Sequence, residues 1–196
     1  MCPSYSSKVL IISAPSGAGK STLVSHLLKS GFPLMFSVSA TSRKPRGNET
    51  DGREYYFITA GEFRKRIRKN EFVEWQEVYK DHYYGTLRKE IDRIRDEGKI
   101  PLFDVDVQGG INLKKIFGDD ALSIFVMPPS VEELRKRLVR RGTDTTEQIE
   151  MRIEKAASEL LLAEHFDRVV INDNLEKACI SIVNTVREFK IGRAHV

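Results

Sequence analysis

Cysteine is almost absent from this sequence of 196 residues, which contains only Cys2 and Cys179. Two cysteines near opposite ends of a chain cannot build a disulfide framework or a zinc cluster, so we expect a reducing, cytoplasmic setting. Hydrophobic runs long enough to span a bilayer are also lacking, and the short polar segment 1–7 does not resemble a signal peptide. We therefore expect no membrane partner.

Charge of one sign is not in large excess either, since 32 basic residues stand against 28 acidic ones, giving a formal net charge of +4. A balance this close does not demand nucleic acid as a partner, because a small anionic ligand explains the surplus equally well. The chain is 40% hydrophobic and 31% charged. At this length we expect one domain with a real core, carrying at most small excursions.

Apolar runs separated by segments of helical character predict an α/β fold with a mainly parallel sheet. Four runs have the composition of buried strands, and a fifth strand with alternating polar residues is expected over Leu34–Ala40. The four runs are Val9–Ser13, Ile100–Val105, Leu122–Met127 and Arg168–Asn172. Helices are expected over 22–30, 86–97, 131–141 and 175–189, the third with Ser130 as its N-cap.

Between the fifth strand and residue 86 the pattern changes. Residues 43–53 are polar and rich in turn formers, and short strands over 54–59 and 72–78 flank a basic helix over 60–70. This combination predicts a small α+β excursion placed over the main sheet.

A glycine-rich segment joins the first strand to the first helix. It comprises Ala14, Pro15, Ser16, Gly17, Ala18, Gly19, Lys20 and Ser21. A loop of this kind points backbone N–H groups at a phosphate chain from a helix N-terminus. Lys20 would add charge near the β- and γ-phosphates, and the Ser21 hydroxyl would bind magnesium. Ala14 replaces the first glycine of the pattern, which a small residue with a negative φ permits.

Two arginines three residues apart, Arg43 and Arg46, flank Pro45 on a loop. Guanidinium groups bind phosphate through paired hydrogen bonds, so this pair suits a second phosphate site. A solvated surface pair is the alternative, but Tyr55 and Tyr84 can offer hydroxyl donors to the same anion.

Glu74 lies beside aromatic residues in the segment 71–75. A carboxylate that accepts from two adjacent N–H groups suits the guanine edge, which presents N1–H and N2–H₂, whereas adenine presents an acceptor at N1. Thr86 could donate to guanine O6. An exposed, solvated strand glutamate is the alternative interpretation of Glu74.

Asp104 and Asp106 lie two residues apart where an apolar strand ends. We expect both carboxylates on one side of the sheet, at the carboxyl edge where open α/β sheets bind ligands. One would act on magnesium through water and the other on the guanine amino group, and these residues alone do not decide which. The alternative is that Asp104 caps a helix.

The order of these motifs resembles the guanylate kinase family from Lys8 to about Phe189. The matching segments are SAPSGAGKS, FSVSATSRKPR, EYYF, EFVEW, HYYGT, FDVDVQG, RRGTD and VIND. The resemblance implies a P-loop NTPase fold with a five-stranded sheet, a core (1–36, 87–128 and 157–190), a GMP-binding part (37–86) and a helical lid (129–156). It implies that Arg43, Arg46, Tyr55 and Tyr84 hold the GMP phosphate, and that Ser39, Glu74, Thr86 and Asp106 contact guanine.

For the donor nucleotide, the resemblance implies contacts from residues 14–22, including Thr22, and from Arg137 and Asn172, with Asp173 nearby. Lys20, Arg43, Arg141 and Arg152 would act on the phosphoryl group in transfer, and Ser21 with water-linked Asp104 would hold Mg²⁺. The implied reaction is ATP + GMP ⇌ ADP + GDP, with dGMP as a further acceptor, in purine nucleotide metabolism and GMP recycling. The expected partners are the small-molecule substrates ATP and GMP, with no nucleic acid. The protein would be a monomer or a homodimer.

Two other functions are consistent with parts of the sequence. One is a P-loop kinase for a different phosphorylated acceptor, against which Glu74 and Thr86 argue. The other is a non-catalytic phosphopeptide-binding module related to guanylate kinases, against which Lys20, Ser21 and the lid arginines argue. Residues 191–196 match the translation of a sequencing adapter, so we expect a non-native tail and exclude it from functional reasoning, a natural polar terminus being the alternative.

Overall fold

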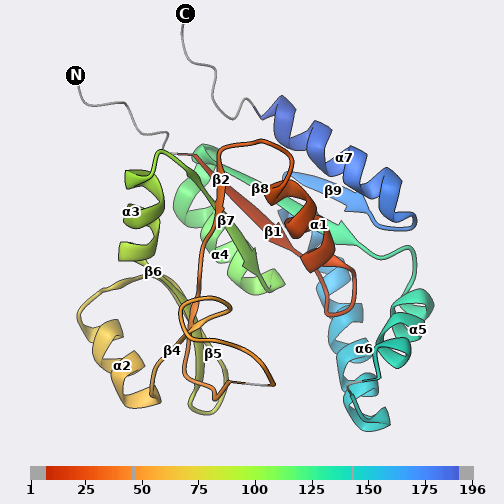
Figure 1. Cartoon of the computed structure of the whole chain (residues 1–196). Coiled ribbons are helices and arrows are strands. Elements are labelled where there is room, and N and C mark those ends of the chain that lie inside the picture. The colour runs from red at the N-terminus through yellow and green to blue at the C-terminus, as the bar shows by residue number, and fades with distance from the viewer. Residues whose placement is uncertain (1–7, 46, 143, 190–196) are drawn as a thin grey trace, which may run out of the picture.

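A parallel sheet of five strands, in the order β2-β7-β1-β8-β9, forms the centre of the protein (Figure 1). The computed structural model describes residues 8–45, 47–142 and 144–189. The strands are β1 (Val9–Ser13), β2 (Leu34–Phe36), β7 (Ile100–Val105), β8 (Ala121–Met127) and β9 (Arg168–Ile171). The parallel α/β sheet predicted from the sequence is confirmed.

Helices cover both faces of this sheet because side chains of β1 alternate between two buried clusters. Leu10 and Ile12 pack in the cluster that contains residues of α1 (Lys20–Leu28) and α7 (Leu175–Glu188). Val9 and Ile11 pack in the cluster formed with α3 (Arg88–Asp96) and α4 (Val107–Phe117). All four side chains are fully buried, so the phosphate-loop strand lies at the centre of the core.

A second sheet of four strands, here called the small sheet, has the order β4-β3-β6-β5. Its strands are β3 (Ala40–Thr41), β4 (Tyr56–Phe57), β5 (Phe72–Tyr79) and β6 (His82–Leu87). Helix α2 (Ala60–Arg68) packs on it through Phe63, whose ring stacks on Phe72 with centroids 4.2 Å apart. The small sheet therefore has an aromatic core of its own.

The strand expected over Leu34–Ala40 is two strands, and this prediction is wrong. Strand β2 ends at Phe36 in the parallel sheet, whereas Ala40 belongs to the small sheet. Between them the Val38 N–H donates to the Glu90 carboxylate at 3.0 Å instead of to a strand. Alternation of polar and apolar residues continues through this crossing, so the sequence pattern does not reveal it.

The helix expected over 86–97 begins only at Arg88, because Thr86 and Leu87 belong to strand β6, which the sequence analysis did not identify. Helix α4 was not predicted from the sequence either. Two consecutive glycines weaken the helical signal there, although Gly110 is required: an added Cβ would lie 2.2 Å from Ser13 Oγ. Close packing of α4 on β1 explains this glycine.

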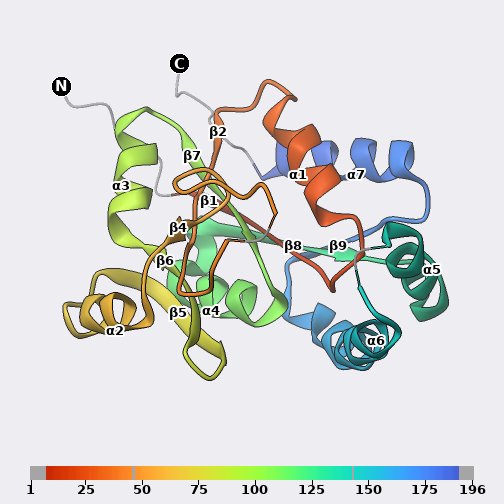
Figure 2. The ribbon, with the colours of Figure 1, turned by 60° about the horizontal axis from the view of Figure 1, so that its bottom comes forward.

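Two further helices, α5 (Val131–Arg141) and α6 (Thr146–Leu160), form a pair called here the helical pair. The predicted cap of α5 is confirmed, since Ser130 Oγ accepts from the Glu133 N–H at 3.1 Å. Short 3₁₀ helices cover Gly118–Asp120 and Leu161–His165. The small sheet and the helical pair lie on opposite sides of the parallel sheet's lower end in both ribbon views (Figures 1 and 2).

Candidate active site

A cavity of about 1170 Å³ lies where the glycine-rich loop, the small sheet and the helical pair meet. Its wall includes the loop residues Ala14 to Gly17 and Gly19 to Thr22, together with Asp104 and Asp106 at the carboxyl end of β7. Open α/β sheets bind ligands at this edge. A smaller cavity of about 300 Å³, lined by Lys114, Asp167 and Phe189 among others, contains none of the predicted site residues. The larger cavity is therefore the candidate site.

The glycine-rich loop has the backbone that its sequence requires. Gly17 and Gly19 both have a φ of +90°, a conformation that L side chains rarely adopt. Asn70 and Asp81 are the only non-glycine residues with positive φ in the described chain, so Ala14 meets its condition. The loop leads directly into the N-terminus of α1, where an anion is favoured by the helix dipole.

Lys20 and Asp104 form an ion pair inside this cavity. The Lys20 ammonium also donates to the Val105 carbonyl oxygen at 2.9 Å. The cation expected at the β- and γ-phosphates thus contacts the end of β7. Ser21 is exposed at the start of α1 and lines the same cavity, so a hydroxyl and a carboxylate suitable for magnesium share one space.

Asp106 caps helix α4, whereas the alternative considered from the sequence gave a cap to Asp104. The Asp106 Oδ1 accepts from the Gly109 N–H and from the Gln76 side-chain amide, each at 2.8 Å. Gln76 lies on β5, so this contact joins the small sheet to the core. Both aspartates line the cavity, which confirms that they share one side of the sheet.

Glu74 is buried, not solvated, with 8% of its surface exposed. It faces fully buried Thr86 across the pairing of β5 and β6, and Thr86 Oγ1 donates to Glu74 Oε1 at 3.2 Å. Burial raises the pKa of Glu74 to about 7, with a further contribution from Asp106, whereas the Thr86 hydrogen bond opposes the rise. Because Glu74 lines the cavity, its carboxyl can meet a ligand there.

Arg43 is almost covered, with 9% of its side chain exposed. Its guanidinium lies 4.9 Å from the centre of the Tyr55 ring, and its Nε donates to the Tyr84 hydroxyl at 3.1 Å. The predicted trio Arg43, Tyr55 and Tyr84 is therefore brought together. Ser39 lines the cavity nearby, and Arg46 lies outside the described residues.

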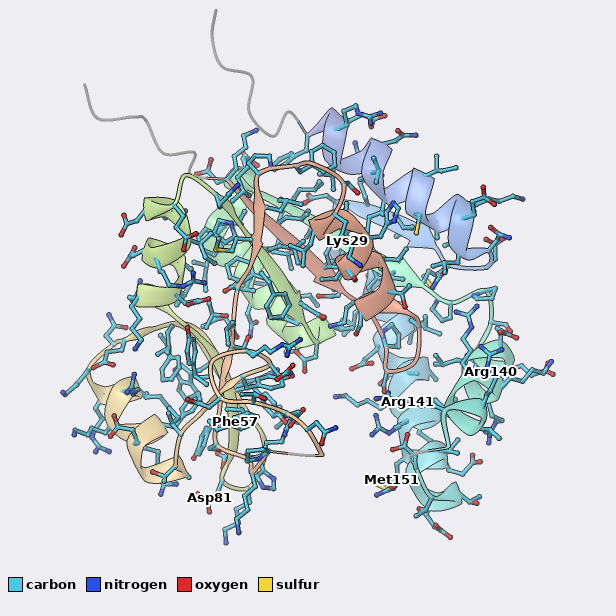
Figure 3. The ribbon with its side chains drawn as sticks, viewed as in Figure 1. Lys29, Phe57, Asp81, Arg140, Arg141 and Met151 are labelled. Atoms are coloured by element: carbon cyan, nitrogen blue, oxygen red, sulfur yellow. The ribbon has the colours of Figure 1, made fainter. Side chains whose placement is uncertain are left out.

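The arginines of the helical pair reach the cavity in different ways. Arg152 donates to Ser16 Oγ in the glycine-rich loop at 2.7 Å and pairs with Asp144 at 3.0 Å. Arg137 donates to the Asn172 carbonyl oxygen at 2.9 Å. Arg141 points from α5 toward the cavity that it lines, whereas Arg140 points away (Figure 3).

Asn172 contacts the glycine-rich loop through its side chain. Its buried side-chain amide donates to the Ala18 carbonyl oxygen at 2.8 Å, and a Cβ on Gly19 would come within 2.3 Å of the same amide nitrogen. The predicted contact of Asn172 with adenine stays a prediction. Asp173 is exposed beside it.

Sequence reasoning missed one complete face of α6. Gln148, Met151, Arg152, Lys155 and Glu159 all line the cavity, and only Arg152 was identified beforehand. Their spacing of three and four residues was the available signal. Met151 is 62% exposed and points from α6 toward the side of the small sheet (Figure 3). Burial raises the pKa of Glu159, and its i,i+4 partner Lys155 opposes that rise.

Comparisons with known proteins agree with this geometry. The family model described as guanylate kinase matches residues 6–189. A guanylate kinase of Bacteroides thetaiotaomicron is 54% identical over 182 residues, covering 93% of this chain and 89% of that protein. One from Porphyromonas gingivalis is 53% identical over 183 residues, covering 93% and 97%. The crystal structure of guanylate kinase from Anaplasma phagocytophilum superimposes with a TM-score of 0.74 at 32% identity, covering 92% and 85%. The chain belongs to the guanylate kinase family.

Proposed function

We propose that the cavity holds both nucleotides of the guanylate kinase reaction and that its residues divide into a donor half and an acceptor half. As a member of this family the chain is a phosphotransferase that converts GMP to GDP with ATP. The observation that carries the proposal is a cavity with the glycine-rich loop on one wall and Glu74 on another, where Glu74 is buried and accepts a hydrogen bond from Thr86 behind it.

The donor half would consist of residues 14–22 with the lid residues Arg137 and Arg152. Backbone N–H groups of the loop would bind the ATP phosphates, and Lys20 would leave Asp104 to contact them. Ser21 and, through water, Asp104 would hold Mg²⁺, because a hydroxyl and a carboxylate facing one open cavity fit its oxygen ligands. Magnesium neutralises phosphate charge when bound.

The acceptor half would lie on the small sheet. The Glu74 carboxylate would accept from guanine N1–H and N2–H₂, with Thr86, Ser39 and Asp106 completing the contacts to the base. Tyr55, Tyr84, Arg43 and Arg46 would hold the GMP phosphate. This arrangement would turn the phosphate of GMP toward the donor half, which is the positioning that phosphoryl transfer needs.

Residues 37–86 and 129–156 would act as moving parts, the GMP-binding part and the lid. Arg141 and Arg152, with Lys20 and Arg43, would stabilise the charge on the phosphoryl group as it passes between nucleotides. Closing would exclude water, so that GMP and not water accepts the phosphoryl group. The contact of Arg152 with Ser16 already joins the lid to the loop.

Other details stay predictions: use of dGMP, a monomer or homodimer, a cytoplasmic location and the lack of a nucleic-acid or membrane partner. Within the described ranges, no helix is both long enough and apolar enough to cross a bilayer.

The acceptor profile with ATP and Mg²⁺ tests the proposed site. We expect ADP formation with GMP, weaker turnover with dGMP and little with AMP, measured in a coupled assay. AMP turnover equal to that of GMP would remove Glu74 and Thr86 from base selection. Absence of ADP formation with retained peptide binding would instead support the non-catalytic module.

A further inference from the structure

Arg43 is bound by a carboxylate of its own chain. Its Nη1 donates to Glu49 Oε2 at 2.6 Å and its Nη2 donates to Glu49 Oε1 at 2.7 Å. Nη1 also donates to the Lys44 carbonyl oxygen at 2.9 Å, and Nε donates to Tyr84. A guanidinium has five N–H groups, and these contacts engage four of them.

This paired contact is the one that a phosphate makes with arginine. Two parallel N–H groups point at two oxygens of one anion, so the Glu49 carboxylate occupies the positions that two phosphate oxygens would take. The hydrogen bonds that Arg43 donates to Glu49 and to Tyr84 hold the pKa of Arg43 above its ordinary value, although burial lowers it. Arg43 is therefore permanently charged, and the anion that it contacts is the Glu49 carboxylate of the same chain.

The cavity wall shows the consequence of this pairing. Tyr55 and Tyr84, which both contact Arg43, line the cavity, whereas Arg43 is not among its lining residues. A phosphate that entered between the two tyrosines would meet their rings and hydroxyls before it met the guanidinium. Arg43 can offer such a phosphate its paired Nη1 and Nη2 donors only if the contact with Glu49 is released.

Glu49 is the more exposed partner of this pair. Its side chain is 22% exposed, compared with 9% for Arg43, so the carboxylate has a path to solvent. It lies on a loop bounded by Gly47 and Gly52, which have φ values of +54° and +77° and tolerate backbone angles that other residues avoid. Separation of the pair would therefore move the acid toward solvent and leave the more buried arginine in place.

We propose that Glu49 is an intramolecular substitute for the GMP phosphate, which holds Arg43 while GMP is absent and is displaced when GMP binds. This inference rests on the proposed acceptor half of the site. A dianionic phosphate and a carboxylate cannot share the same guanidinium fork, since like charges at this separation repel. Glu49 thus lowers the affinity for GMP by the free energy needed to break its own contact, and the ATP half is unaffected.

A role for Glu49 in orienting Arg43 predicts the opposite change in KM for GMP. If Glu49 stayed in place and only oriented Arg43 for a phosphate bound at another edge, its loss would weaken GMP binding. The sign of the change in KM for GMP therefore separates the two.

The test is Glu49→Gln in the full chain, with KM for GMP, KM for ATP and kcat measured together. The amide keeps the shape but loses the charge, so we expect KM for GMP to fall about five- to tenfold. KM for ATP and kcat should stay within about twofold. An unchanged or raised KM for GMP overturns the proposal, and failure of the unaltered chain to phosphorylate GMP would refute the acceptor site itself.

Glu54→Gln is the matched control, because Glu54 lines the same cavity and its removal deletes the same charge. The change in KM for GMP in Glu54→Gln measures the general effect of removing one negative charge. The change in KM for GMP in Glu49→Gln must exceed it. Inorganic phosphate, tested as a competitor of GMP, gives a second readout, and we expect Glu49→Gln to bind it more tightly. If the variant loses stability, Glu49→Asp, which keeps the charge on a shorter side chain, should give an intermediate KM.

Discussion

Replacing Glu74 by glutamine tests the acceptor half most directly, because it alters the charge of a buried group while nearly keeping its shape. The pKa of this carboxyl is raised from 4.5 to about 7, first by burial and then by Asp106. Between these two values the folded protein holds a proton that the unfolded chain has lost. Glutamine never ionises, so the variant removes this difference.

The magnitude follows from the two pKa values. Stability from the protonated carboxyl is fully present below pH 4.5 and is lost as the pH rises through about 7. Each tenfold difference in proton affinity is about 1.4 kcal/mol, so ionisation costs the folded state about 3 kcal/mol at high pH. We therefore expect the free energy of unfolding of Glu74→Gln, relative to the unaltered chain, to rise by up to about 3 kcal/mol between pH 4.5 and 8.

Urea unfolding at both pH values, without nucleotides, measures this difference. Glu154→Gln is the control, because Glu154 is exposed on α6 and should show no such dependence on pH. In the unaltered chain kcat/KM for GMP should fall as the pH drops below about 7, since guanine needs the ionised carboxylate, and the variant should lose GMP selectivity while retaining ATP binding. A free-energy difference that is the same at both pH values would refute the reasoning. Equal loss of GMP and ATP binding would indicate a folding defect.

Three other substitutions probe the donor half of the site and the stability of the fold. Lys20→Ala should lower kcat by about 100-fold or more with a smaller change in KM, as steady-state kinetics would show, because the lysine acts on charge that develops in the transition state. Gly19→Ala should raise KM for ATP, since its Cβ would meet the Asn172 amide at 2.3 Å, and KM for GMP should change little. Glu90→Gln should destabilise the fold by about 2 kcal/mol at neutral pH. Burial raises the pKa of Glu90, but Arg93 and other donors outweigh it and lower the pKa below 4.5, so this loss should shrink as the pH falls below 4.5 in urea unfolding.

Each change has a matched control. Lys29→Ala removes an exposed lysine at the other end of α1, and its kcat should stay unchanged (Figure 3). Gly31→Ala carries the strain of a positive φ with no heavy atom within 4 Å, so it isolates the clash at Gly19. Glu132→Gln alters an exposed surface pair with little effect on stability. A kcat of Lys20→Ala equal to that of the unaltered chain would remove Lys20 from the mechanism.

The parallel sheet could be predicted from the sequence because each buried strand is a continuous apolar run that ends at a turn former. The bounds of β1, β7 and α5 agree with the expected ones. The small sheet was harder. Its strand β6 carries polar and aromatic residues whose burial depends on pairing with β5, and such pairing between distant segments leaves no local pattern.

The candidate site was predictable where a residue's role depends on its own chemistry. Glu74 and Asp106 both line the cavity, and Thr86 contacts it only through its hydrogen bond to Glu74. What could not be predicted was which acidic group each cation contacts, because side-chain pairing depends on the folded geometry and not on local sequence. The contact of Glu49 with Arg43 is the clearest example, since an acidic residue six positions away on a polar loop has no distinguishing sequence signal.

The two predicted phosphate sites share one electrostatic arrangement. Lys20 is paired with Asp104, and Arg43 is paired with Glu49, so each predicted phosphate site has one cation that contacts a carboxylate of the chain. An unpaired cation in the cavity would repel other positively charged groups and attract any anion from solution. With a carboxylate in place, only a ligand that also binds the surrounding N–H groups or the guanine-reading pair gains enough to displace it. Under the role proposed for Glu49, complete GMP therefore has an advantage over free phosphate at Arg43, because its base gains contacts with Glu74 that free phosphate cannot make.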